Sequence, residues 1–403
     1  MSSVFYSAEE KKFKKEIHEW AQENLKPLAK PAINGDYNAV RKALKLCAEK
    51  GLCGAIHDPK YGGTGKGIVW ESIIAEEIAG INGAIEMTRL VSATLFGMPL
   101  TTYGTEEQKQ KYLPKITSGE WIGAIAMTEE NAGSDLSMMQ TQIVREGDEY
   151  VINGHKRYIT NGGEADIISL YGVLQNIEDP NPRKRITGVL VETKTKGFKI
   201  TERYDLSGME GASVARMEFK DMRVPVENLL GKEGQGFTIL MSELNVERIG
   251  MAAACVGHAQ AAFDIALKYS TERVQFKRPV STLEGVSFRL ADCATKIQAT
   301  RLLTLEAAKM IDAHKEKEAT IAASMAFAYG TEMEIEVTNC CVMTLAGEAI
   351  THRTDVVPVM WRMAPVMWVV GGTTDIQKFI IQRELYKPFK KKEKKVAPEA
   401  KSK

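Results

Sequence analysis

Apolar residues recur at helical spacing along the first part of the chain. Ser7 and Glu10 form a capping box, the signal of a helix N-terminus, and a face of apolar residues follows it. A second periodic stretch, 39–50, ends at a glycine that suits a helix C-terminus. Thr105 caps one more short amphipathic helix. Residues 1–120 therefore predict an N-terminal α-helical domain.

The pattern changes near Trp121, where glycines become frequent and short β-branched runs alternate with turns. The run 167–171 is one such strand candidate. Asn153 and Gly154 form a dipeptide that is typical of a β-hairpin turn. Residues 121–236 therefore predict a middle β domain.

Helical periodicity then returns in three long segments, 237–274, 284–313 and 319–345. Small residues are frequent in the first of them, which favours close antiparallel packing. Residues 237–389 therefore predict a C-terminal four-helix bundle. The order of helices, strands and helices gives an α+β fold with two or three domains, as expected for 403 residues.

Composition narrows the function classes. The 53 basic and 52 acidic residues leave a net charge of +1, so nothing favours nucleic acid or an anionic membrane as partner. Residues 390–403 form a Lys-rich stretch that predicts a disordered tail. The cysteines lack metal-ligand spacing, so no metal site is expected. They predict reduced core thiols and a cytoplasmic protein. The six cysteines are Cys47, Cys53, Cys255, Cys293, Cys340 and Cys341.

Two polar segments stand out in the β region. The first, 126–135 (AMTEENAGSD), ends a strand in a Gly/Ser turn that exposes backbone N–H groups and hydroxyls. The second, 153–163, carries Tyr158 and Thr160 two positions apart, on one face of a predicted strand. An aromatic wall beside a hydroxyl suits the edge of a flavin. Taken separately, an ordinary turn and a surface hairpin are the more frequent explanations.

Together the two segments resemble signatures of the acyl-CoA dehydrogenase family, "TExxAGSD" and "ITNG". Three later segments resemble that family as well: 224–237 (VPVENLLGKEGQGF), 269–279 (YSTERVQFKRP) and 371–385 (GGTTDIQKFIIQREL). The resemblance implies an acyl-CoA dehydrogenase-like fold. It also implies FAD as cofactor and oxidation of an acyl-CoA thioester to an enoyl-CoA.

The resemblance also implies a set of binding residues. The FAD site would comprise Met127, Thr128, Gly133, Ser134, Tyr158, Thr160, Arg273, Phe276, Gly347 and Thr373. Arg273 and Phe276 would come from a neighbouring subunit of a homotetramer. Substrate contacts would come from Ser134, Arg248, Gly371 and Gly372. An electron-transferring flavoprotein would take up the electrons.

The sequence departs from the family pattern at the base. Members often carry "YEGT", whose Glu removes the acyl α-proton, but Gly371 stands at that position here. Met343 and Glu284 replace glutamines that are common near the adenine. Some relatives place the base before an arginine on the first bundle helix, where this chain has Glu247 and Arg248. Glu247 is therefore the candidate catalytic base, against the alternative of a surface Glu in an ion pair.

Three alternatives remain. A cyclic or already unsaturated acyl-CoA would use a different base. The apolar stretch 87–100 near that pocket holds no carboxylate, although Glu86 precedes it. The chain could also be a non-catalytic paralogue, or a flavin monooxygenase of the same fold. The physiological direction, including reverse enoyl-CoA reduction, is open.

Overall fold

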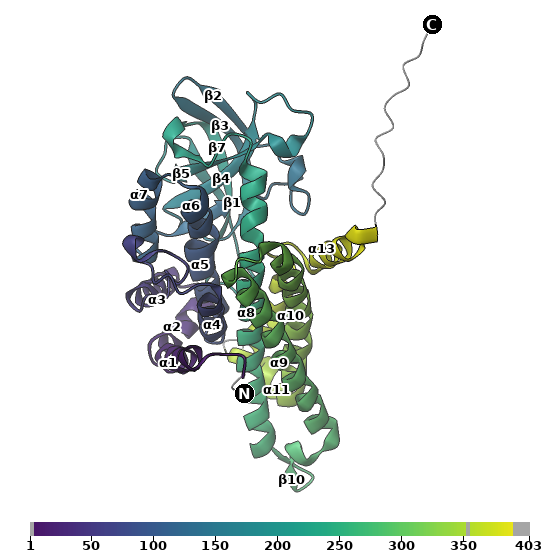
Figure 1. Ribbon diagram of the computed structural model, residues 1–403. Coiled ribbons are helices and arrows are strands. Elements are labelled where there is room, and N and C mark those ends of the chain that lie inside the picture. Colours follow the sequence, from purple (N-terminus) through teal and green to yellow (C-terminus); the bar gives the residue numbers. More distant parts are fainter. Residues whose placement is uncertain (1–3, 352–354, 390–403) are drawn as a thin grey trace.

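The computed structural model describes residues 4–351 and 355–389. The predicted tail, 390–403, lies outside the described residues. In Figure 1 the β domain lies at one end, helices from both ends of the sequence lie below it, and α8 (Gly236–Glu272) runs between the two regions. The order of helical, β-sheet and helical regions confirms the fold class predicted from the sequence.

The N-terminal region consists of seven α-helices. They are α1 (Ala8–Asn24), α2 (Lys26–Ile33), α3 (Tyr37–Glu49), α4 (Ile68–Ala79), α5 (Gly83–Leu90), α6 (Gly97–Tyr103) and α7 (Glu106–Thr117). Both predicted capping boxes are present, Ser7 with Glu10 and Thr105 with Gln108. Between α5 and α6 the chain stays helical through a π-helical segment, Val91–Phe96.

The middle region is one sheet. Its strands are β1 (Gly123–Ala126), β2 (Gln142–Glu146), β3 (Glu149–Ile159), β4 (Ile167–Leu174), β5 (Ile186–Glu192), β6 (Phe198–Tyr204), β7 (Val214–Pro225) and β8 (Leu229–Leu230). The order is β6-β7-β3-β2-β4-β5-β8, and β1 pairs with β4 in parallel. The parallel pairing brings the end of β1, where the AMTEENAGSD segment begins, into the middle of the sheet.

The hairpin predicted at Asn153–Gly154 is wrong. The turn is Gly147–Asp148, between the paired residues Glu146 and Glu149. Gly154 lies inside β3, at a break in the register with β7. A Cβ there would come within 2.7 Å of the Thr141 hydroxyl, so close packing of the backbone, and not a turn, requires the glycine.

The C-terminal region contains α8, α9 (Glu284–Asp312), α10 (Glu316–Leu345), α11 (Gly347–Thr351), α12 (Val356–Met367) and α13 (Thr374–Tyr386). A small hairpin, β9 (Val274–Gln275) and β10 (Arg278–Pro279), joins α8 to α9. In Figure 1 this hairpin lies at the end of the bundle furthest from the sheet, and α13 projects to one side.

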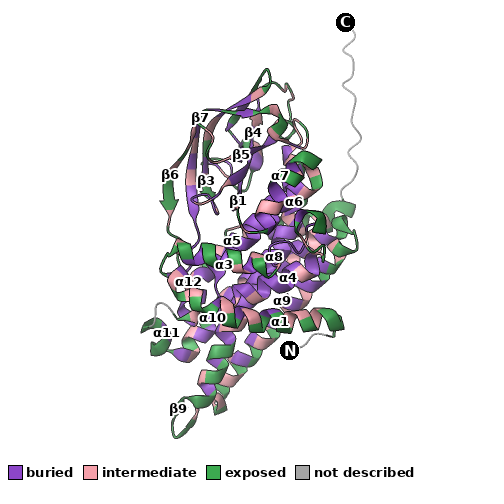
Figure 2. Cartoon of the chain, turned by 90° about the vertical axis from the view of Figure 1, so that its left-hand side faces the viewer, coloured by how far each residue is buried: buried purple, intermediate pink, exposed green. Residues whose placement is uncertain are grey.

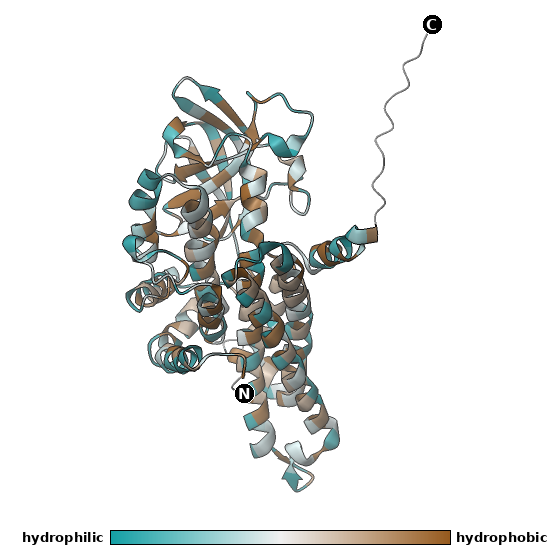
Figure 3. Cartoon of the chain, viewed as in Figure 1, coloured by the Kyte–Doolittle hydropathy of each residue, from teal (hydrophilic) through white to brown (hydrophobic). Residues whose placement is uncertain are grey.

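Helix α8 forms part of the common core of the three regions. Buried residues dominate it in Figure 2, and its middle is among the most hydrophobic parts of the molecule in Figure 3. It is the one described helix long and apolar enough to cross a membrane, but 78% of its most apolar window is buried inside the protein. Such burial is typical of a core helix in a folded domain.

Candidate active site

The turn after β1 is fixed by a buried ion pair. Lys156 on β3 is fully buried, and its Nζ lies 2.7 Å from a Glu129 carboxylate oxygen. The same Nζ donates to the Met127 carbonyl, at 3.0 Å. Glu129 also accepts the backbone N–H groups of Gln140 and Thr141. These contacts hold both ends of the AMTEENAGSD segment, and sequence reasoning missed both charged residues.

Burial lowers the pKa of Lys156 to about 8, although the Glu129 carboxylate opposes that shift. Lys156 lowers the pKa of Glu129, against the effect of burial. The pair therefore remains largely ionised near neutral pH. Its mutual hydrogen bonds give it a structural role at the edge of the site.

Thr128 and Met127 lie at the half-buried edge that this pair supports. Met127 packs against the large hydrophobic core cluster, and the Thr128 carbonyl accepts the Arg157 N–H at 3.0 Å. The edge thus offers an apolar surface next to a hydroxyl. Gly133 and Ser134, further along the turn, are exposed, and a Cβ on Gly133 would meet nothing within 4 Å. Such an edge fits a large planar cofactor with a polar rim.

Tyr158 and Thr160 do not share one face of a regular strand, which corrects the sequence prediction. Strand β3 ends at Ile159, and Tyr158 has a left-handed backbone with φ 55°. The Tyr158 ring is 52% exposed and lies 4.8 Å from the ring of Tyr204, centroid to centroid. The Arg157 guanidinium lies over the Tyr158 ring and donates to its hydroxyl. The side chain therefore presents an aromatic surface at the edge of the sheet, next to the half-buried Thr160.

The next residue, Asn161, is buried. Its amide nitrogen donates to the carbonyls of Thr88 on α5 and Gly123 on β1, both at 3.0 Å. These bonds tie the end of β3 to the helical region. They fix the position of Tyr158 and Thr160 relative to the helices.

Arg273 and Phe276 lie far from this edge within the chain. Both belong to the exposed β9–β10 hairpin region at the far end of the bundle (Figure 1), and Phe276 is 85% exposed. Gly347, at the start of α11, is also exposed. The chain by itself does not bring these residues to Thr128.

Glu247 and Gly371 are brought together. Glu247 is buried on α8, and Gly371 lies before α13 with φ 62°. A Cβ on Gly371 would be 3.2 Å from Glu247 Oε1 and 3.4 Å from Phe327 Cε1. The Glu247 carboxyl therefore occupies the space into which a side chain at position 371 would extend. Positions 124 residues apart in sequence thus share one site.

The alternative of a surface Glu247 in an ion pair is wrong. Its Oε2 is buried and makes no hydrogen bond within the described chain. Burial raises the pKa of Glu247 to about 7, and Arg248 reduces that shift. Arg248 itself donates to Asn245 at 3.1 Å, and burial lowers its pKa to about 10. A carboxyl with this pKa and a free oxygen can accept a proton near neutral pH.

The remaining predicted positions flank Glu247 or lie apart from it. Gly372 has φ 83° and, like Thr373, is half-buried. The Thr373 hydroxyl accepts the Ile376 N–H and caps α13. Met343 is 55% exposed, whereas Glu284 is the first residue of α9. Val370, which precedes Gly371, packs on the same core cluster as Met127.

Glu86 is not available as an alternative base. Its two carboxylate oxygens accept from Arg89 at 2.7 and 2.8 Å, and Arg89 also binds Glu71 at 2.7 Å. All three side chains are buried. The network holds the π-helical turn, since Thr94 within that turn donates to Glu71.

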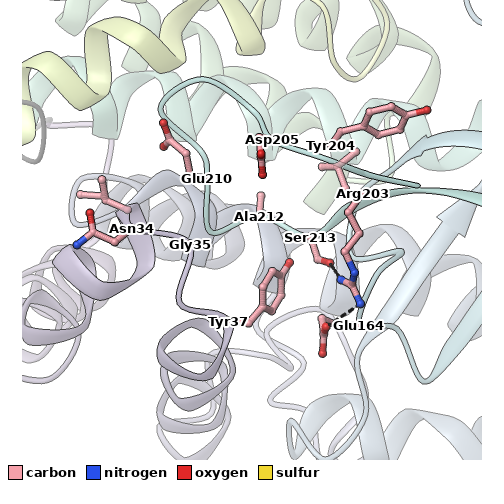
Figure 4. Close-up of a pocket in the computed structure, with 12 residues that line it drawn as sticks. Asn34, Gly35, Tyr37, Glu164, Arg203, Tyr204, Asp205, Glu210, Ala212 and Ser213 are labelled. Atoms are coloured by element: carbon pink, nitrogen blue, oxygen red, sulfur yellow. Dashed lines mark hydrogen bonds and ion pairs between the residues drawn. The ribbon is translucent and has the colours of Figure 1, made fainter. Parts of the chain in front are cut away.

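Two surface cavities have linings that do not include Glu247. One, of about 600 Å³, lies between the α2–α3 turn and the β6–β7 segment (Figure 4). Its arginine, Arg203, is held by the Ser213 hydroxyl at 3.1 Å and by Glu164 at 3.2 Å. The other, of about 440 Å³, lies beside the C-terminal part of α8 and the start of α12. Because no predicted site residue lines either cavity, the candidate site remains the one around Glu247.

Comparison with known proteins agrees with this fold. Three family models match in sequence order: "Acyl-CoA dehydrogenase, N-terminal domain" over residues 7–120, "middle domain" over 124–222, and "C-terminal domain" over 234–386. An acyl-CoA dehydrogenase of Bacillus subtilis is 34% identical over 376 residues, 92% of this chain and 96% of its own. The chain belongs to the acyl-CoA dehydrogenase family.

Two further comparisons bear on cofactor and substrate. A cyclohex-1-ene-1-carbonyl-CoA dehydrogenase of Geobacter metallireducens is 37% identical over 349 residues, 86% of this chain and 90% of its own. An acyl-CoA dehydrogenase of Bacillus anthracis, solved in complex with FAD, has a TM-score of 0.90 and 25% identity. That match covers 96% of this chain and 69% of the solved one. The protein is thus an FAD-dependent oxidoreductase acting on CH–CH groups, which oxidises an acyl-CoA to an enoyl-CoA.

Proposed function

We propose that Glu247 is the base that removes the acyl α-proton, in place of the glutamate that family members often carry at the position of Gly371. The supporting observation is the 3.2 Å separation between Glu247 Oε1 and a Cβ built on Gly371. A carboxyl carried by α8 occupies the space next to the backbone from which the usual base would extend. In this proposal the site retains a catalytic carboxylate, but position 247 carries it and not position 371.

The environment of Glu247 suits this role. Burial raises its pKa to about 7, so that the ionised form is available near neutral pH and is a stronger base than an exposed glutamate. FAD, when bound, accepts the hydride that leaves the β-carbon. Arg248, Ser134, Gly371 and Gly372 contact the thioester in this proposal. Among them, Arg248 has a buried Nε without a hydrogen-bond partner in the described chain.

The flavin is held by the edge of the β domain in this proposal. Thr128 and Met127 contact its pyrimidine side, Tyr158 and Thr160 its ring system, and Gly133 and Ser134 its pyrophosphate region. The Lys156–Glu129 pair and the Asn161 hydrogen bonds support this edge from behind. Gly347 and Thr373 would line the adenine part of the groove.

A second copy of the chain would complete the FAD site, within a homotetramer. Arg273 and Phe276 are too far from Thr128 within one chain, so a neighbouring subunit would supply them. Large apolar side chains are exposed on the C-terminal helices and on the hairpin, which is typical of an interface. These side chains are Phe276, Phe288, Trp361, Trp368, Val369, Phe379, Leu385 and Tyr386.

The electron acceptor in this proposal is an electron-transferring flavoprotein, since the reduced cofactor must be reoxidised before the next turnover. The proposed compartment is the cytoplasm. Its support is the six cysteines, all of which are buried free thiols.

A second candidate is the oxidation of a cyclic or already unsaturated acyl-CoA. The 37% identity to a cyclohex-1-ene-1-carbonyl-CoA dehydrogenase favours it. That reaction would need a base that reaches a more distant carbon. Glu86 is engaged by Arg89 and does not supply one.

The test is anaerobic reduction of the bound FAD by saturated acyl-CoAs in the Glu247→Gln variant. Gln keeps the shape of the side chain but accepts no proton, so the rate of flavin reduction should fall by about 10²–10⁴. FAD content and thioester binding, followed by perturbation of the flavin spectrum, should persist.

The matched control is Glu272→Gln, at the exposed end of the same helix. It should leave the rate of flavin reduction unchanged. A Glu247→Gln enzyme that reduces its flavin at the original rate would remove Glu247 as the base and favour the cyclic or unsaturated substrate.

A further inference from the structure

Glu243 is a second buried carboxyl close to Glu247. It lies four residues earlier on α8, so both side chains are on the same face of the helix, about 6 Å apart along its axis. Glu243 is only 3% exposed. Both of its carboxyl oxygens are buried and make no hydrogen bond within the described chain. Buried polar atoms are rarely left without partners, so this pair of free oxygens needs an explanation.

Among the described residues none forms an ion pair with Glu243. Arg248, further along α8, donates to Asn245, and its charge lowers the pKa of Glu247. Burial, and then the charge of Glu247, raise the pKa of Glu243 well above its usual range. The other ionisable group facing it is Tyr171 on β4, a buried phenol whose pKa is raised by burial and then by Glu243. Burial and the charge of Glu247 therefore both favour the neutral form of Glu243.

A neutral carboxyl offers one O–H donor and one acceptor. An entirely hydrocarbon acyl group packed against it would leave both unsatisfied, which weakens binding. If position 243 served only to pack the core, we would expect an apolar residue there. The neighbouring α8 positions hold such residues, Ile239, Leu240 and Val246. An acyl group with its own oxygen would satisfy both the donor and the acceptor.

We propose that Glu243 is a specificity residue that selects acyl-CoA thioesters carrying a hydroxyl group on the acyl chain, through hydrogen bonds from and to its carboxyl. This inference rests on the proposed function, because Glu247 marks the acyl end of the site. The hydroxyl would lie within about one helical turn of the carbon that Glu247 deprotonates. A hydroxyl is preferred to an ammonium group because the Glu243 carboxyl is buried without a hydrogen-bond partner in the described chain, and burial favours its neutral form.

The experiment uses the FAD-loaded enzyme carrying Glu247→Gln, which binds thioesters without turnover under the proposal. Two pairs of acyl-CoAs of equal size differ only by hydroxyl against methyl: 3-hydroxybutanoyl-CoA with 3-methylbutanoyl-CoA, and 4-hydroxybutanoyl-CoA with pentanoyl-CoA. Dissociation constants come from perturbation of the flavin spectrum. In at least one pair the hydroxylated thioester should bind about 10-fold or more tightly, each factor of ten being 1.4 kcal/mol.

Adding Glu243→Leu should abolish or reverse that preference, whereas Glu243→Gln, which keeps a donor and an acceptor, should retain it. The inference is overturned if the enzyme that retains Glu243 binds the methyl compound more tightly in both pairs. A preference that Leu leaves unchanged also overturns it, because another group would then be the cause. Should Glu243→Leu fail to fold or to hold FAD, the Gln and Glu243→Ala variants give the same comparison.

Failure of this inference is distinguishable from failure of the proposed base. The base is tested by the rate of flavin reduction in Glu247→Gln alone, and the specificity by a ratio of dissociation constants that involves no proton transfer.

Discussion

The buried ionisable side chains at the two ends of the candidate site differ in whether they have hydrogen-bond partners. At the sheet edge, Lys156 and Glu129 bond to each other and, between them, to three backbone groups, those of Met127, Gln140 and Thr141. On α8, Glu243 and Glu247 have carboxyl oxygens that make no hydrogen bond within the part of the chain that the structure describes. Burying a polar group without a hydrogen bond is costly, so such groups persist where function requires them. The first pair holds the turn after β1, and we propose that the second pair serves a ligand.

The largest expected effect comes from moving the proposed catalytic carboxylate from position 247 to position 371. Glu247→Ala should lower the rate of flavin reduction by about 10²–10⁴, because no group then accepts the α-proton. Combining it with Gly371→Glu should recover at least about tenfold of that loss, since the two positions open onto the same space. Stopped-flow flavin reduction measures both variants.

Gly371→Glu alone is the control for this transfer. Its rate of flavin reduction should be lower than that of the double variant, because its Cβ would press on Glu247. The backbone φ of 62° at position 371 is also unfavourable for a side chain. A double variant no faster than Glu247→Ala would show that the two positions are not equivalent for catalysis.

Breaking the Lys156–Glu129 ion pair should lower the stability of the protein and leave Glu243 and Glu247 intact. Lys156→Met leaves the Glu129 carboxylate buried without its partner, which should lower the free energy of unfolding by about 3–5 kcal/mol. Denaturant titration of the FAD-bound protein measures it. Lys50→Met, which breaks an exposed pair with Glu16, should cost less than about 1 kcal/mol. Equal losses in the two variants would contradict the structural role of Lys156.

A smaller effect is expected at the hairpin. Arg273→Ala should weaken FAD retention by about 1.5–3 kcal/mol, because it removes a charge-assisted contact proposed to come from a neighbouring subunit. Equilibrium dialysis of FAD measures it. Arg278→Ala, on the same exposed hairpin, is the comparison. Retention unchanged in Arg273→Ala would remove that residue from the FAD site.

The smallest effect is the pH dependence of Glu247. The base must be ionised, so with a pKa of about 7 the rate of flavin reduction should fall about tenfold from its plateau as the pH drops to 6. The raised pKa also means that the folded state binds a proton that the unfolded state has released between about pH 4.5 and 7. Stability contributed by protonated Glu247 is therefore lost as the pH rises through that window.

Both pH effects should disappear in Glu247→Gln. A wild-type rate that stays flat between pH 6 and 8 would argue against a base with this pKa.

The sequence determined the architecture and provided the candidate for the catalytic base. Local spacing, which a sequence displays directly, produces the helical periodicity and the capping boxes at Ser7 and Thr105. It also produces the change near Trp121 to short β-branched runs between turns. Glu247 also stood out in the sequence, by its place before Arg248. Local patterns failed at Asn153–Gly154 and at Tyr158. There, packing against Thr141 and a left-handed residue replaced the expected turn and the regular strand.

Only the tertiary structure decided which polar groups are satisfied. Glu86, Glu129, Glu243 and Glu247 look alike in sequence, because the type of a residue does not reveal its partners. Folding places Arg89 against Glu86 and Lys156 against Glu129, but it places Gly371 against Glu247 and no cation against Glu243. Burial and pairing are long-range consequences of folding. They separate the carboxylates that hold the structure from those left free to act on a substrate.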